Sequence, residues 1–97
     1  MKLELHPKVY SDVSQIMEYY ERVATPELAD EFYRELRYFI QKAFETPQTF
    51  AIRERDIRRV NLRRFPYHFL FRLTENSVRI LVVRHHGRHP TFGSERE

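Results

Sequence analysis

Residues 67–84, YHFLFRLTENSVRILVVR, decide the fold. Two runs rich in aromatic and β-branched residues, Tyr67–Leu73 and Val78–Arg84, flank residues 74–76 (TEN), which favour a turn. This pattern predicts an antiparallel β-hairpin. Residues 80–83 (ILVV) are all apolar, so both faces of their strand must be covered. We therefore expect both strands in the centre of a sheet, with helices on one face and another surface, such as a partner protein, on the other.

Two more strands are predicted upstream of this hairpin. Ile57, Val60 and Leu62 mark one of them, which follows the polar residues 48–56 and which Pro66 ends. The other lies at the start of the chain, where polar and apolar residues alternate as in a half-buried strand. Its residues are Lys2 to His6.

Two amphipathic helices are predicted between the first and second of these strands. Apolar residues recur every three or four positions over residues 9–23 and again over residues 29–44. Thr25 and Pro26 suit the N-cap and first position of the second helix, and Pro47 prevents its continuation. The aromatic side chains of both helices are expected in the core. The order β-α-α-β-β-β predicts an α+β fold, a twisted antiparallel sheet with a helical hairpin packed on it.

Length and composition narrow the class of protein. The 97 residues fit one domain, residues 1–97, whose polar end, residues 93–97, is a candidate for a disordered tail. The chain has no cysteine, which excludes disulfides, thiolate zinc sites and cysteine nucleophiles and favours a reducing cytosol. The N-terminus lacks the apolar run of a signal peptide, and no run of about 18 apolar residues occurs, so a cytoplasmic protein without membrane contact is expected.

Cofactor and metal sites are not predicted. With two glycines the chain has no phosphate-cradling loop, so no nucleotide cofactor is expected. His85, His86 and His89 lie close together, but no Asp, Glu or Cys occurs between Glu75 and Glu95 to complete a ligand set. Neighbouring arginines would also repel a divalent cation. No metal is therefore expected.

The positive charge lies in the second half of the chain. Residues 1–47 hold six Lys or Arg against nine Asp or Glu, whereas residues 48–97 hold eleven against five. All eleven of these cations are arginine, which forks onto carboxylate or phosphate groups bidentately. Six of them form a cluster: Arg53, Arg55, Arg58, Arg59, Arg63 and Arg64. The cluster predicts a surface that meets an anionic partner.

The order of elements and two motifs resemble the RelE/ParE superfamily of toxins from bacterial type II toxin-antitoxin systems. The motifs are Phe65-Pro66-Tyr67, entered from an arginine-rich strand, and residues 82–90 (VVRHHGRHP), which ends in His85-x-x-Arg88-x-Pro90. Both are closest to the ParE-like, or plasmid-stabilisation, branch. One position departs, because His89 stands where that branch usually has an acidic residue. An Arg–Asp pairing that would hold the terminal segment lacks its acidic member there.

The resemblance implies a growth-inhibiting toxin with a cognate acidic antitoxin encoded by the adjacent gene, assembled as a homodimer or as a toxin-antitoxin hetero-oligomer. RelE-like members cleave mRNA on the ribosome, whereas ParE-like members poison DNA gyrase without a hydrolytic site. RelE-like relatives tend to carry arginine after the tyrosine of the third strand and a C-terminal tyrosine or histidine pair. Here His68 follows Tyr67 and no later tyrosine occurs, which favours the gyrase inhibitor.

Under the ParE-like interpretation no residue is catalytic, and eight are expected to bind the target or the antitoxin: Arg58, Arg59, Arg63, Arg64, Arg84, His85, Arg88 and Phe92. The RelE-like alternative is a ribosome-dependent mRNA endonuclease that uses His68, Arg84, His85 and Arg88, because imidazoles titrate near neutrality and guanidinium groups bind phosphate. A second alternative is a non-toxic nucleic-acid-binding module. Tyr67, Phe69 and Phe71 could stack bases, but their run is apolar on both faces, so most are expected in the core.

Overall fold

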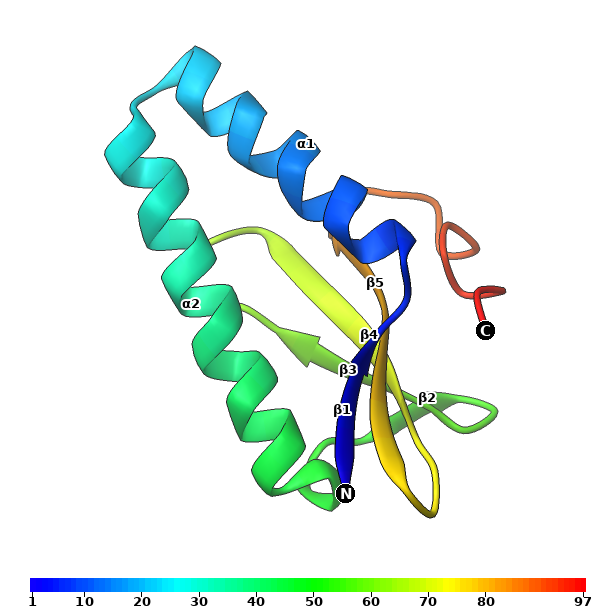
Figure 1. The fold of residues 1–97 in the computed structure, drawn as a ribbon. Helices are drawn as coiled ribbons and strands as arrows, with labels where there is room; N and C mark the ends of the chain where they lie inside the picture. Colours follow the sequence, from blue (N-terminus) through cyan, green and yellow to red (C-terminus); the bar gives the residue numbers. More distant parts are fainter.

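The computed structural model describes all 97 residues. Two helices pack on one face of a five-stranded sheet of order β1-β5-β4-β3-β2 (Figure 1). In chain order the elements are β1 (Lys2–Leu5), α1 (Lys8–Val23), α2 (Pro26–Glu45), the short 3-10 helix η1 (Pro47–Thr49), β2 (Ile52–Glu54), β3 (Ile57–Asn61), β4 (Tyr67–Leu73) and β5 (Ser77–His85). The α+β fold with its helical hairpin is confirmed, and so are the inner positions of β4 and β5.

The sheet differs from the expected one in two respects. Strand β1 pairs with β5 in parallel, from Lys2 opposite Ser77 to Leu5 opposite Ile80, so the sheet is mixed. A four-residue alternating strand shows which face is buried but does not encode the direction of its neighbour. In addition, β2 forms within the polar segment before β3. Its Ile52 is 54% exposed, so this edge strand carries no pattern of burial that the sequence could reveal.

Local signals place the helices as expected. The Thr25 hydroxyl accepts a hydrogen bond from the Leu28 backbone N–H at 3.0 Å, which caps α2, and Pro26 occupies its first position. The helix ends at Glu45, two residues before Pro47. None of the helices is long and apolar enough to span a membrane.

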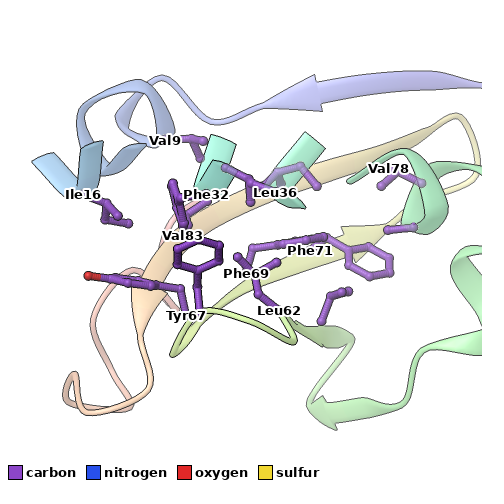
Figure 2. Packing of buried hydrophobic residues seen from close by; sticks show 14 residues of the cluster. Val9, Ile16, Phe32, Leu36, Leu62, Tyr67, Phe69, Phe71, Val78 and Val83 are labelled. Carbon is purple, nitrogen blue, oxygen red and sulfur yellow. The ribbon is translucent and has the colours of Figure 1, made fainter. Parts of the chain in front are cut away.

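The main core lies between the helices and the sheet (Figure 2). Phe69 and Phe71 of β4 and Phe32 of α2 are fully buried there, and Tyr67 is 7% exposed. The expectation that the β4 aromatic residues belong to the core is confirmed, so they offer no stacking surface for bases. The expectation for the helices is wrong for four tyrosines, which are 42 to 64% exposed: Tyr10, Tyr19, Tyr33 and Tyr38.

A β-bulge in β5 builds a second apolar cluster on the opposite face. Val82 pairs with Leu70 but Ile80 pairs with Phe71, so Leu81 is an extra residue without a partner on β4. Leu81 and Val82 consequently join Ile57 and Leu70 in the cluster, and Phe92 packs against it. The second face is therefore covered in part by the chain's own C-terminal segment, residues 90–97, and not by a partner alone.

The C-terminal segment is fixed by buried polar contacts. Arg96 Nη1 donates to Asp12 Oδ2 at 2.6 Å and to the Leu81 carbonyl at 3.1 Å, while the Val83 N–H donates to Asp12 Oδ2 at 3.1 Å. The Leu81 carbonyl and the Val83 N–H lie on the edge of β5 beyond Ile80, where its pairing with β1 ends. The ion pair therefore gives hydrogen-bond partners to two backbone groups that would otherwise be buried without them. Residues 93–97, expected as a disordered tail, thus include Arg96, which bonds to α1 and β5 in this structure.

Gly93 allows the segment to lie this close to β5. Its φ is +79°, and a Cβ at this position would lie 2.4 Å from Cγ2 of Val82. Only glycine fits both the left-handed backbone and the contact without displacement of Val82.

Candidate interaction surfaces

The structure separates the eight residues predicted to bind a partner into three places. Arg84, His85, Arg88 and Phe92 lie at the end of β5 and in the chain that follows it, Arg63 and Arg64 lie beside α2, and Arg58 and Arg59 lie on β3. They do not form one continuous site.

The first place is a hollow of about 280 Å³ between α1, β5 and the C-terminal segment, here called the β5-end hollow. His85 and Arg88 line it and are exposed. The guanidinium carbon of Arg88 lies 3.9 Å from the centre of the half-buried Phe92 ring, and its side chain makes no hydrogen bond or ion pair. Its N–H groups are therefore free for a carboxylate or phosphate group of a partner.

His85 is oriented by two contacts within the same hollow. Its Nδ1 accepts a hydrogen bond from the Gly87 N–H at 2.8 Å, and its ring stands edge-on to Tyr67 with 5.1 Å between centroids. Because Nδ1 is an acceptor, the neutral ring carries its proton on Nε2. His85 can thus donate one hydrogen bond to a partner beside Arg88.

Arg84, the third cation of this region, is 8% exposed and faces inward. Its Nη1 donates to the carbonyls of Pro90 and Phe92 at 2.8 and 2.6 Å, and its Nε donates to His68 Nε2 at 2.8 Å. These bonds hold the start of the C-terminal segment against β5. The structure therefore gives Arg84 an anchoring position and not the exposed one expected for contact with a partner.

His68 is 2% exposed beneath this segment. Burial and the charges of Arg59 and Arg84 lower the pKa of His68 to about 3, so its ring is neutral near pH 7. It accepts a hydrogen bond from Arg84, and because the ring is neutral it cannot act as a general acid at neutral pH. Two of the four residues of the RelE-like alternative, His68 and Arg84, are thus largely buried, at 2% and 8% exposed.

His86 was not among the predicted site residues, and it lies in contact with His68. Their Nδ1 atoms are 2.9 Å apart and their rings are nearly coplanar, at 12°. Since His68 Nε2 accepts from Arg84, the proton of the neutral His68 ring is on Nδ1 and is donated to His86 Nδ1. Burial and the charge of Arg59 lower the pKa of His86 as well. His86 is exposed like its neighbours His85 and Gly87, and nothing in the local sequence indicates its contact with His68.

Beside α2, Arg63 and Arg64 contact the carboxylates of Glu35 and Glu31. The backbone N–H groups of Arg63 and Arg64 both donate to Glu35 Oε2, at 2.8 and 3.0 Å, and the Arg64 guanidinium pairs with Glu31 at 3.0 Å. On β3, Arg58 donates to the carbonyl of Phe50 at 2.8 Å. Of the arginine cluster, these contacts hold only the Arg58 and Arg64 side chains, since Arg63 contributes its backbone N–H alone. Exposed pairs such as Arg64–Glu31 contribute little stability.

A further surface, absent from the sequence interpretation, is an apolar groove of about 880 Å³ between α1, α2 and β1, here called the helical groove. Its walls include the exposed rings of Tyr10, Tyr33 and Tyr38 and the cations Arg34 and Arg37. Apolar side chains line most of the rest, beside Ser14 and Gln41: Leu3, Leu5, Val9, Val13, Met17, Leu36 and Ile40. Exposed apolar surface of this extent, rimmed by polar groups, marks an interaction site.

An ion pair holds the C-terminal segment although His89 cannot be the acidic member of one. His89 Nδ1 lies 2.8 Å from Thr91 Oγ1 and accepts from the Thr91 N–H at 3.3 Å, so it closes only its own turn. The ion pair that holds the segment is formed instead by Arg96 with Asp12 of α1.

The fold is that of a known toxin-antitoxin structure. The chain superimposes with a TM-score of 0.78 on a solved structure described as "Chromosomal ParDE TA system from P. aeruginosa", with 22% sequence identity over 88% of this chain and 95% of that chain. No family model and no curated protein matches the chain. At this level of identity the likeness shows the fold, and the RelE/ParE-like fold expected from the sequence is confirmed.

Proposed function

We propose that this protein is the toxin of a bacterial type II toxin-antitoxin pair, is ParE-like, inhibits DNA gyrase and is neutralised by a cognate antitoxin encoded by the adjacent gene. The observation that carries the proposal is the match to a ParDE system over nearly the whole chain. Two separate open surfaces, the helical groove and the β5-end hollow, agree with a protein that must meet both an inhibitor and a target.

The helical groove is the surface we assign to the antitoxin. An amphipathic segment that folds on binding would bury its apolar side against the tyrosines of α1 and α2, and its acids would meet Arg34 and Arg37 at the rim. Coupled folding suits an antitoxin because the segment is unprotected and easily degraded when free.

The β5-end hollow is the surface we assign to the target. Arg88 presents free guanidinium N–H groups and His85 presents one donor, so together they suit a carboxylate or phosphate group on gyrase. The ribonuclease alternative has less support, because cleavage needs an acid and a base in contact with the RNA and His68 is buried and neutral.

Arg88→Ala is expected to weaken inhibition of gyrase supercoiling by at least about tenfold, because a charge-assisted hydrogen bond is worth roughly 1.5–3 kcal/mol. The variant loses only its contact with Phe92, so its melting temperature should stay within a few degrees of the parent. The measurement is a supercoiling titration with purified protein, beside thermal unfolding.

Arg37→Ala is the matched control, since Arg37 also lies over an aromatic ring, at 5.8 Å from the centroid of Tyr33, but in the helical groove. It should inhibit gyrase like the parent and bind the antitoxin more weakly. The assignment is wrong if Arg88→Ala melts as early as Leu81→Ala, which creates a core cavity worth about 2–5 kcal/mol. Cleavage of ribosome-bound mRNA with no effect on gyrase would establish the RelE-like alternative.

A further inference from the structure

We propose that Arg59 and His86 form a docking site for a carboxylate group of an acidic protein segment, on the sheet face opposite the helices. The two residues come from β3 and from the turn after β5, and Arg59 Nη2 lies 3.4 Å from His86 Nδ1. This site is distinct from both the helical groove and the β5-end hollow.

Arg59, like nine others of the fourteen arginines, has no acidic partner. The four ion pairs of the molecule join Arg64 to Glu31, Arg72 to Asp56, Arg79 to Glu4 and Arg96 to Asp12. Arg59 instead donates through Nε to Asn61 Oδ1 at 2.8 Å and lies against His86, both neutral acceptors. These contacts orient the guanidinium group without neutralising it.

His86 adds a second donor with a fixed tautomer. Its Nδ1 accepts from His68 Nδ1 and lies within reach of Arg59, so the proton of the neutral ring is on Nε2. Arg84 donates to His68 Nε2, and His68 in turn donates from Nδ1, so His86 Nδ1 must be the acceptor. The burial of Arg59 and the charge of the nearby Arg53 lower the pKa of Arg59, so Arg53 adds to the positive potential here. The site thus offers two oriented donors in a positive field.

A protein carboxylate fits this site better than a nucleic acid. Single-stranded nucleic acids bind through exposed aromatic rings, and the exposed rings of this protein, Tyr10, Tyr19, Tyr33 and Tyr38, lie on the helices. A duplex requires several free cations for its phosphates. On this face Arg72 pairs with Asp56 and Arg84 binds backbone carbonyls, so Arg53 is the one other cation that acts on Arg59. One oriented guanidinium with one imidazole donor suits a single carboxylate.

The test is an NMR titration of the ¹⁵N-labelled full chain with a glutamate decapeptide and, separately, with a thymidine decanucleotide. The peptide is expected to shift the His86 ring and Asn61 amide resonances. Arg59→Gln should raise the dissociation constant of the peptide about tenfold. Arg55→Gln, which removes the same charge from the exposed β2–β3 turn, should leave it within about twofold. Arg59→Lys, which keeps the charge but not the fork, should bind more weakly than the parent.

Three results would overturn the inference. One is tighter binding of the oligonucleotide at the same resonances, which would assign the site to phosphate groups of nucleic acid. Another is an equal loss in Arg55→Gln and Arg59→Gln, which would show diffuse attraction. The third is the absence of shifts at His86 and Asn61 with either probe. Thermal unfolding of each variant verifies its fold, and Arg59→Lys tests the site if Arg59→Gln does not fold.

Discussion

Arg96→Ala is expected to lower the free energy of unfolding by about 3–5 kcal/mol, a large share of the stability of a small domain. The Arg96 and Asp12 side chains are only 12% and 7% exposed, and they are joined at 2.6 Å. Removal of the guanidinium leaves the Asp12 carboxylate buried with only the Val83 N–H as a donor, and it leaves the Leu81 carbonyl without Arg96. The measurement is urea unfolding followed by circular dichroism.

Two controls isolate the ion pair. Glu95→Ala, at an exposed neighbour, should change stability by less than about 0.5 kcal/mol. The double variant Asp12→Ala/Arg96→Ala should cost less than the sum of the single variants, because no unpaired charge remains buried. A loss of less than about 1 kcal/mol in Arg96→Ala would mean that the C-terminal segment is not anchored as the structure shows.

The second large effect is a loss of stability in mild acid. The pKa of His68 is lowered to about 3 in the folded protein by burial and by Arg59, whereas an unfolded histidine titrates near 6.5. Below pH 6.5 the unfolded chain therefore binds a proton that the folded chain does not, and stability falls with pH. The loss should be about 2 kcal/mol between pH 7 and pH 5 and about twice that by pH 3. The lowered pKa of His86 acts in the same direction.

The measurement is the free energy of unfolding at pH 7, 6 and 5, a range in which carboxylates contribute little. His68→Gln removes the titrating ring, so its stability should change less over this range than that of the parent by about 2 kcal/mol. His89→Gln alters an exposed histidine and should keep the slope of the parent. Equal slopes for the parent and His68→Gln would contradict the buried, neutral state of His68.

Local patterns were enough to predict much of the fold. The 3.6-residue period of the helices, Thr25 and Pro26 at the start of α2, and the two runs around residues 74–76 each act over a few positions, and the structure agrees with all three. The bulge at Leu81 was not predictable in this way. It places two consecutive residues on one face, and a continuous apolar run is compatible with either register.

The contacts that shape the candidate interaction surfaces were harder to predict, because they join distant parts of the chain. Arg96 and Asp12 are separated by 84 positions, and His68 and His86 by 18. The sequence places arginines on the surface by default, yet Arg84 is buried because backbone carbonyls of Pro90 and Phe92 turn back onto it. Exposed tyrosines such as Tyr10 lie outside the apolar residues that recur every three or four positions along the helices. Only the packing of α1 against α2 shows that they border a groove.

The proposed toxin function is tested most directly by growth. The chain is expressed from an inducible promoter in a bacterium, alone and together with the adjacent gene, and soluble protein is verified in both cultures. Expression alone should stop growth, with filamentation and a DNA-damage response as expected for stalled gyrase, and co-expression should restore growth. Normal growth with folded, soluble protein present, and no difference on co-expression, would contradict the proposed function.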